Sequence, residues 1–291
     1  LSTLTISRSM FSQRNHSQFV SINFQPRMSI TKKNHYNPCF WTAYWNYEYY
    51  HSEEYRKENL PRIQKIYSLN ISADKILPTT TEKVFFEKRM GLAQIDEDAI
   101  LDFEDFFTTH ENLSKNVLFN VIQQNNIKSL EEKTWIASFI SDLIIKHYEN
   151  FNSSVDKYIS DGKQKIDFLV DLNKDYSSAD FHKSRIIPLV ASEWIIYLSK
   201  EFKFPLGDNP ILINNKNILI ALSPKMLLKI NFNKIVMPEK KCEIKHKMNC
   251  YTYKDFIYRT IISSNREIIF NNVDVLEKWR KSKVYLKKQK N

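Results

Sequence analysis

The sequence predicts an α+β fold, with an N-terminal aromatic segment and a helical middle packed on a mostly antiparallel sheet in the C-terminal half. Two observations carry this prediction. Between residues 130 and 150 apolar side chains recur at helical spacing, after a capping box of Ser129 and Glu132. Between residues 194 and 230 short apolar runs alternate with turn residues, which is typical of consecutive strands.

We divide the chain into three parts. Residues 1–27 are rich in Ser, Asn and Gln, contain no acidic residue and precede Met28, so we expect a non-native or disordered leader. An organelle transit peptide is the alternative for such a composition. Residues 28–272 form a single α+β domain, because no linker or internal repeat divides them. Residues 273–291 form a basic C-terminal helix or tail.

The aromatic segment opens the domain. Trp41, Trp45 and Tyr49 are four residues apart, so on a helix they share one face. Such a stripe usually packs into the core, and the alternative is a platform on which nucleic-acid bases stack. Residues 62–77 alternate enough to predict a strand, a turn at residues 72–74 and a returning strand.

Capping residues and apolar periodicity predict the helices of the middle region, at residues 79–90, 96–127, 129–150 and 180–187. The first begins at a capping box of Thr79 and Glu82, and the last ends at Pro188. Residues 151–178 are polar and uneven, so we expect a connection that holds one short strand at residues 167–172.

The C-terminal half is expected to hold most of the sheet. Its predicted strands are residues 194–199, 203–206, 211–213, 218–222, 226–230, 242–248 and 267–270. We expect the first two of these strands to pair with each other. Helices are predicted at residues 254–263 and 273–289.

Composition excludes several classes of protein. The formal charge of +10 favours acidic partners such as nucleic acid. The 3 glycines are too few for a Walker loop or a Gly-rich dinucleotide turn, so we expect no nucleotide cofactor of those types. The 3 cysteines argue against a disulfide scaffold and for a reducing cytoplasm. No apolar run approaches the roughly 20 residues that span a bilayer, so no membrane partner is expected.

Three segments carry a resemblance to a known family. His35-Tyr36-Asn37-Pro38 precedes a run of aromatics, Glu104 and Glu111 lie seven residues apart, and Asp208-Asn209-Pro210 precedes a Leu-Ser-Pro sequence. Over roughly residues 30–270 this order resembles the bacterial and fungal family named domain of unknown function 4238 (DUF4238). The chain departs from it at residues 39–41, where the family usually shows a Gln-Phe-Tyr type sequence. The resemblance implies membership and no activity.

Four residues in these segments are candidate catalytic groups: His35, Glu104, Glu111 and Asp208. Carboxylate oxygens are preferred by hard ions, so Glu104 and Asp208 would hold Mg²⁺ or Mn²⁺ and His35 would act as base on a metal-bound water. In a basic protein this set predicts metal-dependent hydrolysis of a phosphodiester. The structural alternative is a plain turn at residues 208–210, in which Asp and Asn bond their own backbone.

The basic tail suggests a second class of function. Lys278, Arg280, Lys281 and Lys283 would make salt-sensitive phosphate contacts, as part of a non-catalytic nucleic-acid-binding or protein-interaction module. A solvated helix end is the structural alternative. The ligand types of a zinc site also occur, at Cys242, His246 and Cys250 together with residues 35 and 39, although the spacing is not that of a zinc finger.

Overall fold

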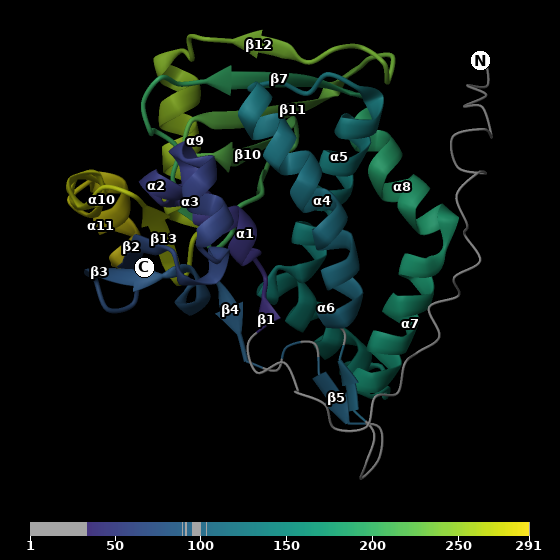
Figure 1. Ribbon diagram of the computed structural model, residues 1–291. Helices are drawn as coiled ribbons and strands as arrows, with labels where there is room; N and C mark the ends of the chain where they lie inside the picture. Colours follow the sequence, from purple (N-terminus) through teal and green to yellow (C-terminus); the bar gives the residue numbers. More distant parts are fainter. Residues whose placement is uncertain (1–33, 89, 91, 95–99, 103, 291) are drawn as a thin grey trace.

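Two sheets and a group of helices organise the computed structural model, which describes residues 34–88, 90, 92–94, 100–102 and 104–290. A five-stranded sheet lies at the top of Figure 1 and a four-stranded sheet lies below it on the left. The helices of residues 104–190 stand on the right. The predicted α+β class, with largely antiparallel sheets and a helical middle, is confirmed. The leader predicted at residues 1–27 lies outside the described residues.

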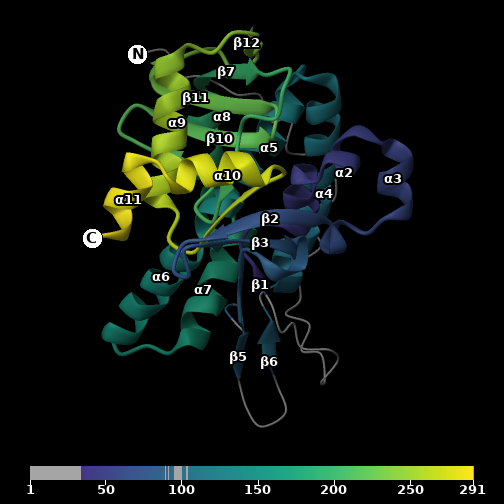
Figure 2. The same cartoon turned by 90° about the vertical axis from the view of Figure 1, so that its left-hand side faces the viewer.

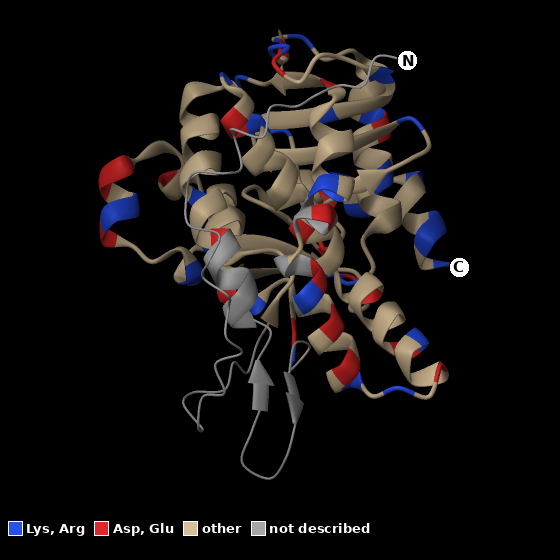
Figure 3. Ribbon diagram, turned by 90° about the vertical axis from the view of Figure 1, so that its right-hand side faces the viewer, with Lys and Arg blue, Asp and Glu red and all other residues tan. Residues whose placement is uncertain are grey.

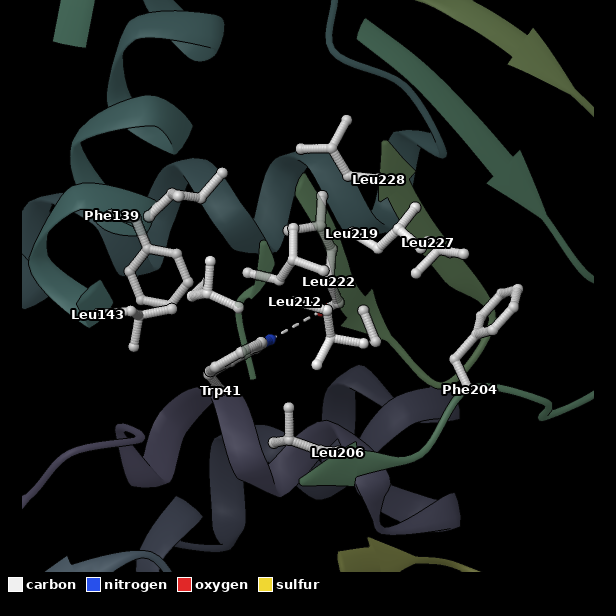
Figure 4. Packing of buried hydrophobic residues seen from close by; sticks show 14 of the residues in the cluster. Trp41, Phe139, Leu143, Phe204, Leu206, Leu212, Leu219, Leu222, Leu227 and Leu228 are labelled. Carbon is white, nitrogen blue, oxygen red and sulfur yellow. Dashed lines mark hydrogen bonds between the residues drawn. The ribbon is translucent and has the colours of Figure 1, made fainter. Parts of the chain in front are cut away.

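The N-terminal segment is a chain of short helical turns after strand β1 (Asn34–His35): α1 (Cys39–Thr42), η2 (Ala43–Trp45), α2 (Tyr47–His51), α3 (Glu53–Glu58) and η3 (Pro61–Ile63). Trp41 and Trp45 are fully buried. The indole N–H of Trp41 donates to the backbone carbonyl of Leu222 at 3.0 Å (Figure 4). The indole N–H of Trp45 donates to the carbonyl of Phe204 at 2.8 Å. The core stripe is therefore confirmed, and these indoles have no open face on which a base could stack.

The four-stranded sheet joins both ends of the chain. Its order is β3-β2-β13-β8, formed by β3 (Lys75–Thr80), β2 (Lys65–Asn70), β13 (Glu267–Phe270) and β8 (Leu206–Gly207), all antiparallel. The predicted hairpin is confirmed. The helix predicted at residues 79–90 is wrong: β3 runs to Thr80, followed by η4 (Thr81–Lys83) and β4 (Phe86–Glu87), which pairs with β1. Strand pairing to β2 up to Thr80 overrides the local capping signal.

The middle of the chain is more helical than predicted. It contains β5 (Leu92–Gln94), β6 (Ile100–Asp102), α4 (Glu104–Gln124), α5 (Leu130–Lys146), α6 (Tyr148–Ser160), α7 (Lys165–Ser177) and α8 (Ala179–Val190). The helix predicted to start at residue 96 is wrong over residues 100–102, which form strand β6, and α4 begins at Glu104. The connection predicted at residues 151–178 is wrong as well, because α6 and α7 pack Phe151 and Tyr158 around Phe168. Pro188 lies inside α8, two residues before its end.

Helix α5 shows why its start was predictable and its end was not. The Ser129 hydroxyl accepts the Glu132 N–H at 3.1 Å, so the predicted N-cap is confirmed. The helix ends at Lys146, earlier than expected, because His147 takes an extended conformation with ψ of 123°. This residue joins α5 to α6.

The five-stranded sheet has the order β12-β7-β11-β10-β9, formed by β12 (Glu243–Lys245), β7 (Ser192–Leu198), β11 (Met226–Ile235), β10 (Asn217–Ser223) and β9 (Leu212–Ile213). Every pair is antiparallel except β12 with β7. The predicted pairing of residues 203–206 with the first strand is wrong. The buried Phe204 turns the chain out of this sheet, and Leu206 pairs with Ile269 of β13.

Three helices complete the chain (Figure 2): α9 (Cys250–Ser263), α10 (Val273–Arg280) and α11 (Lys283–Gln289). The single terminal helix predicted from residue 273 is divided, because the Ser282 hydroxyl caps a new helix by accepting the Tyr285 N–H. Leu276 and Tyr285 are fully buried, so this region belongs to the fold. Over the described ranges, none of the helices combines the length and the apolar character needed to cross a bilayer.

Candidate functional site

Asp208 follows β8 and is completely buried. Its carboxylate accepts backbone N–H groups of the loop before β13, from Asn265 at 3.0 and 3.1 Å and from Arg266 at 2.7 Å. The N–H of Asn209 is a further donor at 3.1 Å. Both carboxylate oxygens thus join two chain segments. Asp208 bonds its own turn, as the structural alternative predicted, and in addition holds the loop before β13. We call this region, residues 207–210 with residues 264–267, the Asp208 corner.

The electrostatics of the Asp208 corner reflect its burial. Loss of solvent raises the pKa of Asp208 to about 6, although the backbone donors oppose that rise. Burial also raises the pKa of Glu267 to about 7, against the Ser68 hydroxyl that donates to it at 3.0 Å. The corner therefore holds two carboxyl groups that ionise only at a cost in free energy.

The His35–Pro38 motif contacts this corner through Asn37. Its side-chain amide donates to the carbonyl of Gly207 at 3.2 Å. A Cβ at Gly207 would lie 2.1 Å from the hydroxyl oxygen of Ser264, so any other residue there would force this buried side chain to move. His35 itself lies in β1, with Nε2 at 3.3 Å from the backbone oxygen of Glu82. Two segments that carry the family resemblance are thus neighbours in space.

Glu111 and Glu104 both belong to α4. Glu111 forms an ion pair of 2.6 Å with Lys146, whose side chain is 1% exposed. Burial raises the pKa of the Cys39 thiol to about 12, and the negative charge of Glu111 adds to that rise. Glu111 is therefore close enough to the N-terminal segment to affect its electrostatics. Glu104 is the first residue of α4, and its side chain lies outside the described part of the chain.

The predicted metal ligands are described only in part, because the side chain of Glu104 is not among the described ones. Within the described ranges, no group of at least 3 His, Cys, Asp or Glu side chains has the geometry to hold a metal ion. This covers the zinc hypothesis, because Cys242 and Cys250 and the residues paired with them are all described; Cys242 is buried and Cys250 exposed. The proposed Glu104–Asp208 pair stays a prediction.

Of the predicted nucleic-acid contacts of the tail, Lys278 and Arg280 lie on α10, Lys281 is its C-cap and Lys283 begins α11. Figure 3 shows basic residues in blue on the helix that leads to the C-terminus. Lys278, Lys281 and Lys283 are exposed. Arg280 is engaged with the carboxylates of Glu277 at 3.1 Å and Asp74 at 3.3 Å. Of the four predicted contacts, the three lysines are therefore open to solvent, while the arginine connects α10 to the turn between β2 and β3.

Sequence reasoning missed a pair of hollows along α9. The first, which we call the polar hollow, has a volume of about 680 Å³ and lies between residues 214–217, β11 and the first turns of α9. Lys216, Lys229 and Arg259 line it, together with Tyr251, which is 80% exposed. Arg259 is paired with Asp255 at 2.9 Å.

The second, which we call the apolar hollow, has a volume of about 300 Å³. It lies between the end of α5, residues 209–213 and the last turns of α9, and Arg259 lines it as well. His147 and Ser263 belong to its wall. Burial lowers the pKa of His147, which keeps the imidazole neutral at pH 7.

One signal in the sequence could have indicated these hollows. Tyr251, Tyr258 and Ile262 lie at positions i, i+7 and i+11 of α9 and are 80%, 51% and 43% exposed. Phe256 and Ile261 of the same helix are buried. A surface helix usually carries polar residues on its exposed face, so large apolar and aromatic residues on that face of α9 indicate a binding surface.

The chain matches none of the family models, none of the curated proteins and none of the solved structures with which it was compared. The resemblance to DUF4238 therefore stays a prediction. The segments that carry it are in contact in this structure: Asn37 donates to the carbonyl of Gly207 in the Asp208 corner, and the carbonyl of Leu222, the first residue of the Leu-Ser-Pro sequence, accepts the indole N–H of Trp41.

Proposed function

We propose that the protein is a nucleic-acid-binding module that holds a single strand along α9. The observation that carries the proposal is the polar hollow, a space of about 680 Å³ lined by Lys216 and Lys229, by the ion pair of Arg259 with Asp255 and by an exposed tyrosine. The two lysines leave the hollow with a net positive charge. Proteins that bind single strands combine a basic groove, which follows the phosphates, with aromatic rings on which bases stack. The formal charge of +10 would draw such a strand to the surface.

The amide groups of the polar hollow support the same ligand. Four asparagines line it: Asn214, Asn215, Asn217 and Asn249. The side-chain oxygen of Asn217 is buried and has no hydrogen-bond partner among the described residues. An amide oxygen without a partner among the described residues is suited to accept from an N–H of a base or from a sugar hydroxyl.

Metal-dependent phosphodiester hydrolysis is the predicted enzymatic alternative, and the binding proposal does not require it. In the present arrangement both oxygens of Asp208 are engaged by backbone donors, so a metal would have to displace them. Membership in DUF4238 and a cytoplasmic location complete the proposal as predictions; the three free thiols support a reducing compartment.

The proposal is tested by fluorescence anisotropy with labelled single-stranded RNA and DNA at several salt concentrations. Replacing Lys216 and Lys229 together by Ala removes two phosphate contacts. We expect about tenfold weaker binding and a slope of log K against log salt that is smaller by about 1.4, from roughly 0.7 for each contact.

The matched control replaces Lys278 and Lys281 by Ala, which removes the same charge from the tail. It should leave the affinity for the strand within about twofold, apart from the general effect of net charge. If instead the tail variant loses the affinity and the hollow variant keeps it, the tail is the interface, and the proposed position on α9 is wrong. Absence of binding by the wild-type protein would end the proposal altogether.

A further inference from the structure

Two residues in the wall of the apolar hollow each carry a buried polar atom that has no hydrogen-bond partner among the described residues. Nε2 of His147 and the hydroxyl oxygen of Ser263 have no hydrogen-bond partner within the described part of the chain, and both residues line the hollow. His147 comes from the break between α5 and α6, and Ser263 is the last residue of α9. Elements that are distant in sequence thus bring two unpaired polar groups to one cavity.

Unpaired polar atoms in a buried position cost free energy, and native proteins rarely keep them without a reason. The neighbouring Ser264 shows the usual solution, because its hydroxyl donates to the carbonyl of Thr260 at 2.7 Å. Ser263, one position along, has the same type of side chain and no such bond among the described residues. A ligand that hydrogen-bonds in the hollow would supply the missing partners.

The remaining walls define the shape of that ligand. Pro210, Ile211 and Ile262 contribute apolar surface, and the hollow measures about 300 Å³. Ligand pockets are commonly apolar with a few polar groups that fix orientation, and this volume lies at the small end of their range. Because the imidazole of His147 is neutral, the polar side of the hollow suits a neutral donor and acceptor edge better than a charged group.

We propose that the apolar hollow binds one nucleobase, with its faces against the apolar wall and its polar edge on Ser263 and His147. The choice of a nucleobase among flat heterocycles rests on the proposed function. Arg259 lines both hollows. If a phosphate of the strand lies beside Arg259, the nucleotide on one side of that phosphate faces the polar hollow and the nucleotide on the other side faces the apolar hollow. One base would stack at Tyr251, and its neighbour would enter the apolar hollow.

The hollow can be tested without any polymer. Free adenosine, guanosine, cytidine and uridine are offered to the full chain, and binding is measured by saturation-transfer NMR and titration. At least one nucleoside should bind the wild-type protein. Ser263→Ala should weaken it about fivefold, the value of one hydrogen bond. His147→Phe, which keeps an aromatic ring against Tyr36, should weaken it to a similar extent.

A second variant, which fills the apolar hollow, separates loss of binding from loss of folding. Ile262→Trp places a large side chain at the hollow and should abolish nucleoside binding, whereas Ile187→Trp on α8 should not. The two isoleucines are 43% and 41% exposed, so both substitutions place a tryptophan at a similarly exposed position and should affect stability to a similar extent. Nucleoside binding that Ile262→Trp leaves intact, or no binding of any of the four nucleosides, would overturn the inference.

The inference and the proposed function can fail separately. Oligonucleotides with a single abasic position are compared with intact ones by anisotropy. If intact strands bind the protein, while an abasic position at any place costs nothing and free nucleosides do not bind, the nucleobase pocket is wrong and the groove survives. If nucleosides bind and strands do not, the pocket stands and the proposed function fails.

Discussion

The Asp208 corner and the α9 surface treat polar groups in opposite ways. In the corner, Asp208 is fully buried and its oxygens are satisfied by backbone N–H groups. Along α9, Asn217, His147 and Ser263 each keep a buried polar atom that no described residue satisfies. Completed hydrogen bonds stabilise a fold, while incomplete ones in a hollow indicate a place for a ligand. The hydrogen bonds of the corner give its motif a structural role, while a catalytic role of Asp208 stays a prediction; our proposal of a ligand therefore rests on the α9 surface.

The largest expected effect breaks the corner. Asp208→Ala leaves buried N–H groups of Asn265 and Arg266 without an acceptor, so we expect the free energy of unfolding to fall by about 4 kcal/mol. Urea denaturation measures the loss, and Asp156→Ala, an exposed change on α6, should alter stability by no more than about 0.5 kcal/mol. A variant at position 208 that is as stable as the wild type, but loses a Mg²⁺-dependent nuclease activity, would favour the catalytic hypothesis.

The second effect is a dependence on pH that belongs to the corner. A carboxyl group whose pKa is raised on folding, as burial raises that of Glu267 to about 7, holds its proton more firmly in the folded state. The free energy of unfolding therefore falls as the pH rises from about 4.5 to about 7, by roughly 2 kcal/mol for this group. Chemical denaturation across that range measures it. Glu267→Gln should make the profile less steep, chiefly between about pH 6 and 7, while Asp208 with its pKa of about 6 keeps a slope at lower pH. An equally steep profile between pH 6 and 7 in that variant would assign the effect elsewhere.

The third effect concerns binding and not stability. Tyr251 is 80% exposed, so Tyr251→Ala should leave the melting temperature unchanged. If a base stacks there, affinity for single strands should fall by about 1–2 kcal/mol. Tyr47, which is 61% exposed beside Phe202, supplies a comparison on another surface. An equal loss of affinity in Tyr47→Ala would remove the special position of the α9 surface.

The smallest effect compares two adjacent serines. Ser264→Ala removes a paired, fully buried hydroxyl and should cost about 1 kcal/mol of stability. Ser263→Ala removes an unpaired one, so stability should stay the same or rise slightly. Thermal unfolding of the two variants side by side measures the difference. Equal losses in both would show that Ser263 has a structural partner after all.

The fold was predictable where local signals and tertiary pairing agree. The strand–turn–strand pattern of β10 and β11 and the N-cap of α5 are examples. Prediction failed where tertiary contacts prevailed, as at Thr79 and Thr80, which the ladder with β2 holds in a strand. It failed again in α6 and α7, whose many polar residues hid the apolar spacing of Phe151 and Tyr158.

The candidate site was predictable only in part. Asp208 is recognisable because Asp-Asn-Pro is a turn sequence. Its partners are backbone N–H groups of residues 265 and 266, and a backbone group leaves no trace in the type of residue. The unpaired atoms of His147 and Ser263 are equally hidden, because the lack of a partner is a property of the packed structure.

The pairing of β2 with β13 has a consequence for the synthesis of the chain. Ser68 and Glu267, which hydrogen-bond across this pair, are 199 positions apart. The hairpin of β2 and β3 leaves the ribosome long before β13 exists, and until then one strand edge lacks its partner. Unpaired edges recruit other chains. The four-stranded sheet therefore closes late, and during translation the hairpin of β2 and β3 keeps an open edge at which other chains can pair.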